Sequence, residues 1–287
     1  MASTTTAVAT VRVAPRSTVV ELRAIKIVWE REVVRFASDR LRMVTSLIQP
    51  LLFLFVMGSG LSQVAMAGTG GLDFRTFLYP GILAMAVMFT AMFSAASVVW
   101  DREFGFMREM LVAPIRRSSI VIGKCLGGAT VATFQGVLVI ALAGLVGVPY
   151  DLSLMLEIFV MLTVLAYTLT AFGVMVAARI KQIQSFMALT QMLIMPLFFL
   201  SGAIFPVTGL PTWLAVLNRI DPLTYAVDPM RRAVFKHLDV TPAVREQLAP
   251  GVTWLGWQVP SLVCAGVVAV LGVAMTAVAI AEFNHSE

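Results

Sequence analysis

The sequence predicts an all-α protein that crosses a membrane several times. Its mean hydropathy is +0.89 and only 13% of its residues are charged, whereas about 25% are charged in an average soluble domain. Runs of roughly 20 apolar residues, the length of a transmembrane helix, recur along the chain. These runs are continuous rather than alternating, which favours helices over a β-barrel, because lipid offers backbone groups no hydrogen-bond partners.

The N-terminal region divides into two parts. Residues 1–17 are mostly Ala, Ser, Thr and Val, which predicts a disordered tail. Residues 18–42 carry apolar side chains at mostly three- and four-residue steps with basic residues on other faces, which predicts an amphipathic helix lying in the membrane interface. The expected apolar face comprises Leu22, Ile25, Trp29, Val33, Phe36 and Leu41. A helix packed on a soluble partner is the alternative, and we expect no cleavable signal peptide.

Six spans follow this helix. We expect them at about 44–66, 76–99, 119–147, 153–178, 185–206 and 258–281. If the N-terminus is cytoplasmic, 15 of the 21 basic residues fall on the cytoplasmic side. The positive-inside rule therefore predicts that both termini are cytoplasmic, and the net charge of +5 is a topology signal rather than a sign of nucleic-acid binding.

A compact charged segment separates the second and third spans. The stretch "VVWDREFGFMREMLVAPIRRSS", residues 98–119, holds seven charges in 17 residues. Each would cost about 2.5–3.5 kcal/mol at the bilayer centre, so we expect the segment in water on the cytoplasmic face. Phe104, Met107 and Met110 or Leu111 would share one face of a short helix at about 100–113, which Pro114 ends. A solvated interfacial turn is the alternative.

The fifth span is followed by a segment of about fifty residues on the opposite face. Prolines and glycines interrupt the end of the span and the start of this segment, so one straight helix is not expected. We predict re-entrant helices at about 203–257, because broken helices at membrane depth are tolerated where they pack on protein or line a cavity. A loop lying in the interface would have the same sequence pattern.

Two stretches carry a family resemblance. "WDREFGFMREMLVAPIRRSSIVIGKCLGG" resembles the signature of type-2 ABC exporter permeases, with Glu109, Leu111, Pro114, Arg116 and Lys124 as the matching residues. "PLFFLSGAIFPVTGLPTWLAVLNRIDPLTYAVDPMR", residues 196–231, resembles that family's fifth span and its re-entrant segment. The resemblance covers nearly the whole chain and is strongest to the drug- and antibiotic-resistance branch.

The resemblance implies a cell-membrane protein of a bacterium that works as a dimer, with a second copy or a homologous permease, on two separate ATPase subunits. The helix after the second span would be the coupling helix seated in the ATPase, and the 18–42 helix would lie beside it. The implied ATPase-coupling residues are Asp101, Arg102, Glu103, Phe104, Met107, Arg108, Glu109 and Leu111. Spans one, two and five would line the pathway, with candidate residues Gln49, Phe53, Gln191, Phe198 and Ser201.

The chain itself lacks the residues that catalysis would need. No G-x-x-x-x-G-K-[ST] loop occurs, so ATP and Mg²⁺ would be bound by the partner ATPase and this chain would hold no cofactor. Its two histidines and two cysteines form no metal-ligand spacing. Span interiors hold almost no charges, Lys124 being expected to snorkel to the inner face, which disfavours an ion-coupled carrier.

The sequence thus predicts the membrane subunit of an ATP-driven exporter of a hydrophobic or amphipathic substrate, such as a drug or a lipid, with no enzymatic activity of its own. Two alternatives stay open. One is a polysaccharide or glycolipid permease of the same family, and the other is a membrane assembly scaffold without transport.

Overall fold

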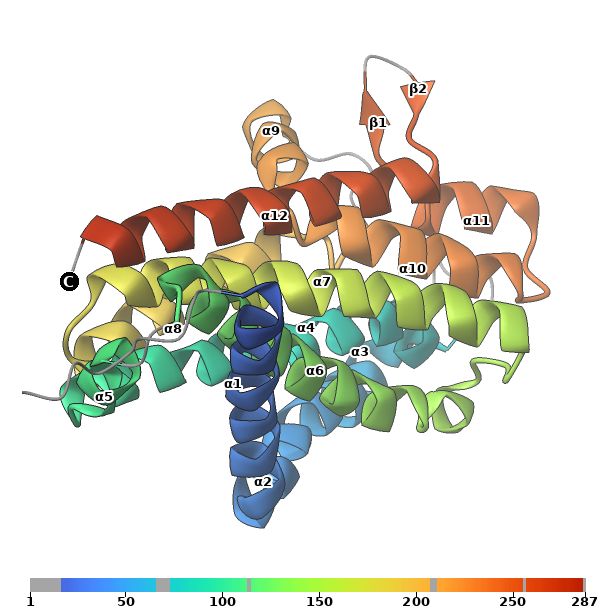
Figure 1. The fold of residues 1–287 in the computed structure, drawn as a ribbon. Helices are drawn as coiled ribbons and strands as arrows, with labels where there is room; N and C mark the ends of the chain where they lie inside the picture. Colours follow the sequence, from blue (N-terminus) through green and yellow to red (C-terminus); the bar gives the residue numbers. More distant parts are fainter. Residues whose placement is uncertain (1–16, 66–72, 113–114, 207–210, 255–256, 286–287) are drawn as a thin grey trace, which may run out of the picture.

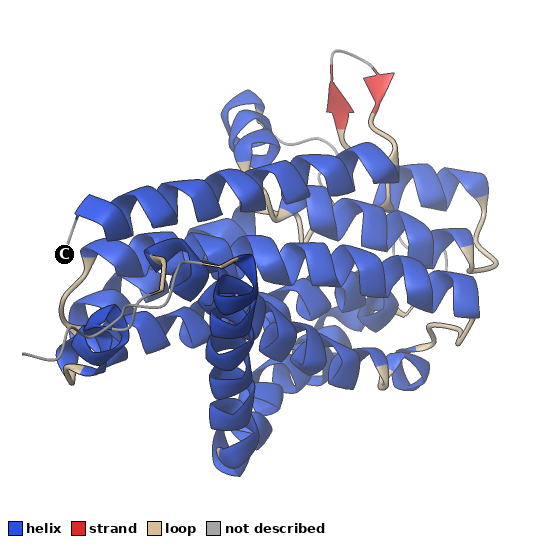
Figure 2. Cartoon of the chain, viewed as in Figure 1, coloured by secondary structure: helices blue, strands red, loops and turns tan. Residues whose placement is uncertain are grey.

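The computed structural model describes residues 17–65, 73–112, 115–206, 211–254 and 257–285. Helices dominate this part of the chain, and a two-residue pairing of strands is its only sheet (Figures 1 and 2). Six stretches are long and apolar enough to cross a membrane: Met43–Ser62, Phe74–Glu103, Arg117–Ile140, Leu152–Arg179, Ile183–Leu200 and Ser261–His285. The predicted all-α, six-span architecture is therefore confirmed, with boundaries shifted by a few residues. The predicted tail, 1–17, lies outside the described residues apart from Ser17.

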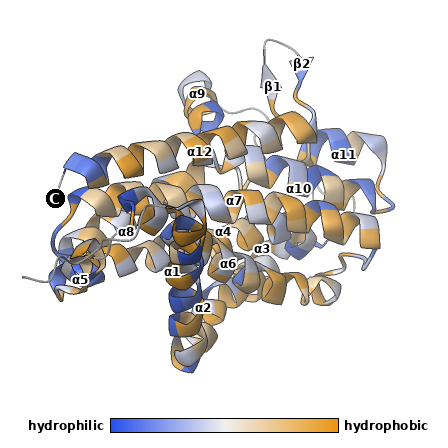
Figure 3. Ribbon diagram, in the orientation of Figure 1, coloured by the Kyte–Doolittle hydropathy of each residue, from blue (hydrophilic) through white to orange (hydrophobic). Residues whose placement is uncertain are grey.

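Helix α4 (Phe74–Glu103) forms the centre of the bundle. Of its most apolar stretch 89% is buried, and it packs against α6 (Arg117–Ile140) and α7 (Leu152–Arg179). The sixth span, α12 (Ser261–His285), lies along α7 (Figure 1). By contrast only 17% of the most apolar stretch of the first span and 22% of that of the fifth, α8 (Ile183–Leu200), are buried. Both spans are largely apolar (Figure 3), and each leaves large apolar side chains exposed, for example Val56 in the first span and Met192 in the fifth.

The first span is built from three consecutive helical pieces. These are α2 (Arg40–Leu52), the π-helix η1 (Phe53–Met57) and α3 (Gly58–Ala65). Pro50 lies inside α2 and has no N–H to donate to the preceding turn. The wider π turn follows directly, so this span is irregular near its middle.

Helix α1 (Thr18–Ser38) lies crosswise to the spans (Figure 1) and packs on α6. The single helix predicted over 18–42 is wrong at its end, because α1 stops at Ser38 and α2 begins at Arg40. The predicted apolar face is also offset from the observed one. The residues that α1 buries are Ala24, Val28, Glu32 and Phe36, so only Phe36 was anticipated.

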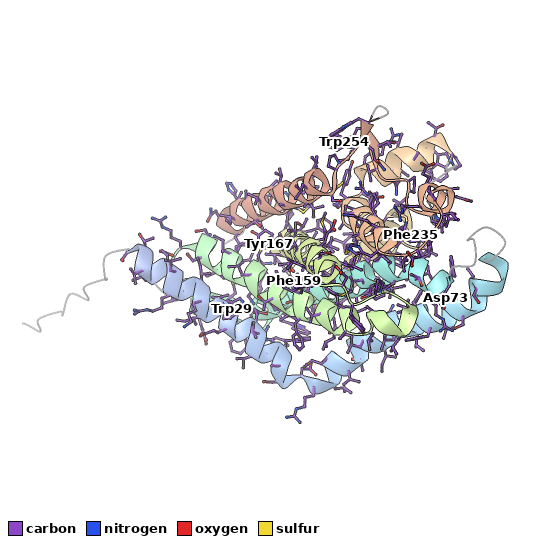
Figure 4. All side chains as sticks on the ribbon, turned by 90° about the vertical axis from the view of Figure 1, so that its right-hand side faces the viewer. Trp29, Asp73, Phe159, Tyr167, Phe235 and Trp254 are labelled. Atoms are coloured by element: carbon purple, nitrogen blue, oxygen red, sulfur yellow. The ribbon has the colours of Figure 1, made fainter. Side chains whose placement is uncertain are left out.

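Two glycines set the close approach of α1 to α6. A Cβ on Gly123 would lie 2.7 Å from Val28 Cβ, and one on Gly127 would lie 2.6 Å from Glu32 Cβ. Trp29 Nε1 donates to Thr130 Oγ1 of α6 at 2.9 Å, and Figure 4 shows the indole between the two helices. The G-x-x-x-G spacing in the third span therefore serves helix packing.

The segment between the fifth and sixth spans is folded rather than a loop. It contains α9 (Thr212–Ile220), α10 (Thr224–Lys236), α11 (Pro242–Leu248) and the antiparallel strands β1 (Thr253–Trp254) and β2 (Trp257–Gln258). Helix α10 is buried against α4, α7 and α12, although its sequence is polar. At the same end of the bundle, the 3₁₀ turn η2 (Ala143–Val146) joins α6 to α7.

Arg231 attaches this segment to the bundle. Its side chain is 3% exposed, and its Nη2 donates to the carbonyls of Gly202 and Ala203 at 2.7 and 3.1 Å. The guanidinium carbon lies 4.2 Å from the ring centre of Phe77, a cation–π contact. Burial lowers the pKa of Arg231 to about 10, so the group stays charged at neutral pH. The turn after α8 is thereby held on α4.

Candidate coupling site

The charged segment after the second span is not one helix. Helix α4 continues to Glu103. Phe104 and Gly105 form a non-helical turn, and α5 (Phe106–Val112) follows. Gly105 has a φ of +82°, a conformation that glycine adopts without strain and other residues rarely adopt. The helix predicted over about 100–113 is therefore wrong, since its first four residues belong to α4.

Asp101 is the centre of a buried ionic cluster and not a surface residue. It accepts hydrogen bonds from Lys124 of α6 and from Arg31 and Arg35 of α1, the last at 3.2 Å. Its side chain is 1% exposed, so no partner protein could touch it in this arrangement. The expectation that Asp101 contacts an ATPase therefore does not fit its position.

Lys124 joins three helices in the same cluster. Its Nζ donates to Asp101, to Glu32 Oε1 at 2.6 Å and to Ser97 Oγ at 3.0 Å, and its side chain is 1% exposed. The expected snorkelling of Lys124 is therefore wrong. Burying this ammonium group is tolerable because it faces two carboxylates, which are of opposite sign. The cluster ties α1, α4 and α6 into one unit.

Arg102 and Glu103 hold the connection between the fourth and fifth spans. Arg102 Nη1 donates to the carbonyls of Ala177 and Ile180 at 3.1 and 2.8 Å. Glu103 Oε2 accepts from the backbone N–H of Ile183, the first residue of α8, at 3.0 Å. A carboxylate at a helix N-terminus is favourable because it meets unpaired N–H groups there. These contacts therefore link the end of α4 to the end of α7 and to the start of α8.

Glu21 of α1 holds the start of the third span in a similar way. Its Oε2 accepts from Ser119 Oγ at 2.5 Å and from the backbone N–H of Arg116 at 3.1 Å. These contacts link α1 to the first turn of α6, immediately after α5. Helix α5 is therefore flanked by segments that α1 holds in place on both sides.

The remaining predicted coupling residues divide by exposure. Met107 is 1% exposed and packs in the core beneath α5, whereas Phe104 is 71% exposed and Glu109 is also exposed. The predicted common face of Phe104 and Met107 is thus split between solvent and core. Phe106, which the sequence pattern did not single out, is 52% exposed beside them. The side chains of Arg108 and Leu111 lie outside the described residues.

The predicted pathway residues are brought together only in part. Phe53 of η1 and Phe198 of α8 meet edge to face with ring centres 6.4 Å apart. Ser201 is buried, and its hydroxyl donates to the carbonyl of Phe198 at 2.7 Å. Gln191 is on an exposed face of α8, and its side chain makes no hydrogen bond within the described part of the chain.

Gln49 lines a cavity of about 390 Å³ between α1, α2, α4 and α8. Thr90 of α4, which sequence analysis did not select, also lines it, and its buried Oγ1 has no hydrogen-bond partner among the described residues. Aromatic side chains of Phe36, Phe89, Phe93 and Trp100 supply much of the remaining wall. The cavity can therefore hold a ligand with an apolar body and a polar group.

The sequence matches a family model described as ABC-2 type transporter over residues 23–235. The chain belongs to this family. The matched region runs from α1 to the last turn of α10, so it contains the ionic cluster, α5 and the cavity.

Individual relatives include a nodulation protein and two proteins named as transport permeases. Nodulation protein J of Rhizobium leguminosarum bv. trifolii is 31% identical over 214 residues, which is 73% of this chain and 80% of the relative. ycf38 of Cyanophora paradoxa, a putative transport permease by name, is 30% identical over 194 residues, 66% of each chain. YbhR of Escherichia coli strain K12, named as a probable multidrug ABC transporter permease, is 30% identical over 167 residues, 58% of this chain and 45% of the relative. The protein is thus a membrane permease subunit of an ABC transporter.

Proposed function

We propose that this permease is the membrane subunit of an ATP-driven exporter of hydrophobic or amphipathic molecules, and that a separate ATPase docks on α5. Two such ATPases and two permease copies would form the working unit. The proposal also places α5 and both termini in the cytoplasm of a bacterium, as the distribution of basic residues favours.

The observation that carries the proposal is that α5 is partly exposed and directly connects two helices of the ionic cluster, α4 and α6. Helix α5 and the turn before it expose Phe104, Phe106 and Glu109, yet α5 lies between two helices that the ionic cluster connects. Exposed aromatic residues such as this pair of phenylalanines are enriched at protein interfaces. A push on α5 would reach α4, α6 and, through Glu103, α8. Because packed helices move as units, closure of an ATPase dimer could shift the second, third and fifth spans together, and the first span through α1, which directly precedes it.

The cavity supports the class of substrate. Its aromatic wall and the polar groups of Gln49 and Thr90 suit a molecule with both characters, such as a drug or a lipid. YbhR is a probable multidrug permease by name, which supports the same choice. A polysaccharide or glycolipid carrier is the second candidate, because sugars also stack on aromatic rings and bond to polar groups.

The test is the purified complex with the ATPase encoded beside this chain. We expect Phe104→Ser with Glu109→Lys to lower ATPase binding by at least about tenfold, since both residues are exposed and their replacement spares the core. Asp239→Lys is the matched control, because it reverses an exposed acid at the opposite end of the bundle. Normal binding and ATP turnover in the double variant would refute the docking site.

Transport assays then separate the classes of function. ATP-dependent release of a fluorescent lipid or drug from vesicles supports the exporter. Uptake driven by an ion gradient without an ATPase would indicate a secondary carrier, and a complex without transport would indicate a scaffold.

A further inference from the structure

The segment between the fifth and sixth spans carries five basic residues, although the family topology places it on the outer face, where basic residues are disfavoured. Two of the five have evident structural roles. Arg231 anchors the turn after α8, and Arg232 pairs with Asp228 at 2.9 Å and donates to the carbonyl of Val259 at 2.9 Å. Neither role accounts for Lys236 and Arg245.

Lys236 and Arg245 line the same cavity. Its volume is about 440 Å³, and it lies between α10, α11 and the base of the hairpin. One wall is fixed by Gln258, whose Nε2 donates to the carbonyl of Pro250 at 2.8 Å. Gly251, with a φ of +82°, allows this approach, because a Cβ there would lie 2.6 Å from Gln258 Nε2. The cavity is therefore a built feature of the segment rather than a gap between mobile side chains.

The charges in this cavity are unbalanced. Arg232 also lines it but is neutralised by Asp228. Lys236 and Arg245 make no ion pair or side-chain hydrogen bond with any residue that the structure describes, and Glu246 is the one acid in the described lining. Two cations thus face one carboxylate. Convergent cations in a partly enclosed site concentrate the positive potential and attract anions.

The cavity lies level with the ends of two spans. His237 follows Lys236, and its Nε2 is 3.2 Å from Ser153 Oγ in the first turn of α7. Arg232 contacts the carbonyl of Val259, two residues before α12 begins. Both spans therefore start at the depth of the cavity, which is where lipid headgroups lie.

We propose that this basic pocket, in which Lys236 and Arg245 are the unpaired cations beside the paired Arg232, binds a phosphate-type anionic group, such as that of a phospholipid headgroup. The guanidinium of Arg245 can offer paired N–H donors to a phosphate, and Lys236 can approach the same group as a point charge. The inference does not depend on which molecule the permease transports.

The test compares the purified full chain with the double variant Lys236→Gln/Arg245→Gln. Binding of phosphatidylglycerol and of phosphatidylcholine is measured by native mass spectrometry, with and without inorganic phosphate. Arg219→Gln is the matched control, because it removes an exposed cation from the same segment outside the pocket. Thermal unfolding of each variant without lipid shows that the fold is retained.

We expect the chain and its Arg219→Gln control to bind phosphatidylglycerol at least about tenfold more tightly than phosphatidylcholine, equivalent to about 1.4 kcal/mol. The double variant should lose this preference. If millimolar phosphate displaces phosphatidylglycerol from the unmodified chain but has no effect on the double variant, the pocket is supported and its ligand is assigned to a soluble anion. Equal lipid binding by the chain and the double variant would overturn the proposal.

Discussion

Replacing Lys124 with methionine tests whether the buried ionic cluster stabilises the permease. Methionine has a similar length and no charge, so the substitution removes the ammonium group with little change in volume. The hydrogen bonds to Asp101, Glu32 and Ser97 are lost together. Glu32, 3% exposed at its side chain, then keeps only the Arg35 guanidinium at 3.9 Å as an ionic neighbour among the described residues.

The size of the effect follows from this geometry. Removing one partner of a buried ion pair costs about 3–5 kcal/mol, because the other charge is left buried and uncompensated. Asp101 still contacts Arg31 and Arg35 after the substitution, so we expect the free energy of unfolding to fall by about 3 kcal/mol, the low end of this range. At about 2 °C per kcal/mol for a chain of this size, the unfolding midpoint should fall by roughly 6 °C.

The assay is thermal unfolding of the purified full chain in detergent, read at one scan rate, because membrane proteins often unfold irreversibly. Lys181→Met is the matched control, since Lys181 is exposed in the connection between α7 and α8 and should shift the midpoint by less than about 1 °C. The double variant Glu32→Gln/Lys124→Met should be more stable than Lys124→Met alone, because it removes both ends of one pair. A Lys124→Met midpoint equal to that of the unmodified chain, or a double variant that is less stable than the sum of its parts, would refute the reasoning.

Three further outcomes can be measured on the same preparation. Burial raises the pKa of Asp221 to about 7, so the folded state holds its proton between pH 4 and 7 while the unfolded state releases it, and stability should fall as the pH rises through this window. Asp221→Asn should flatten that pH dependence and stabilise the chain at pH 8, by up to about 4 kcal/mol; an unchanged profile would show that Asp221 is not the group responsible. Gly127→Ala should destabilise the contact of α1 with α6, whereas Gly266→Ala, with open space at its Cβ, should be neutral or stabilising by about 1 kcal/mol in thermal unfolding, and equal effects would contradict the close packing. Phe53→Ala and Phe198→Ala should show a coupling of about 0.5–1.5 kcal/mol in a double-mutant cycle of unfolding, and strict additivity would mean that the rings do not interact.

The spans were predictable because membrane crossing depends on length and hydropathy, both of which are local properties. The points at which helices end were harder to predict from the sequence. Gly105 separates α4 from α5 through its positive φ, and a single glycine among charged residues does not indicate a left-handed conformation. The offset of the α1 face has a similar origin, because Glu32 is polar in the sequence and becomes part of the buried face only when Lys124 reaches it.

The parts of the candidate site that sequence analysis missed depend on pairs distant along the chain. Lys124 and Glu32 are separated by 92 residues. A lysine near the end of a span, considered alone, is expected to extend toward water, and nothing local reveals that two carboxylates lie within its reach. The burial of α10 has the same kind of cause. Arg231 and Arg232 can be buried because they donate to backbone carbonyls distant along the chain and because Arg232 pairs with Asp228. The signal in the sequence was the presence of charged residues within or beside apolar segments. Such charges need partners when they are buried, but the sequence does not say which residues these partners are.

The ionic cluster also constrains the order in which the protein can be made. Its members come from the helix before the first span, the end of the second span and the start of the third, so the cluster cannot close until the third span has left the ribosome and entered the bilayer. Until then Asp101 has only Arg31 and Arg35, which are synthesised first, as ionic partners from this cluster. Lys124 enters last and locks the three segments together. The N-terminal helix therefore supplies three of the five charged groups of the cluster before either of the spans that hold the other two has been synthesised.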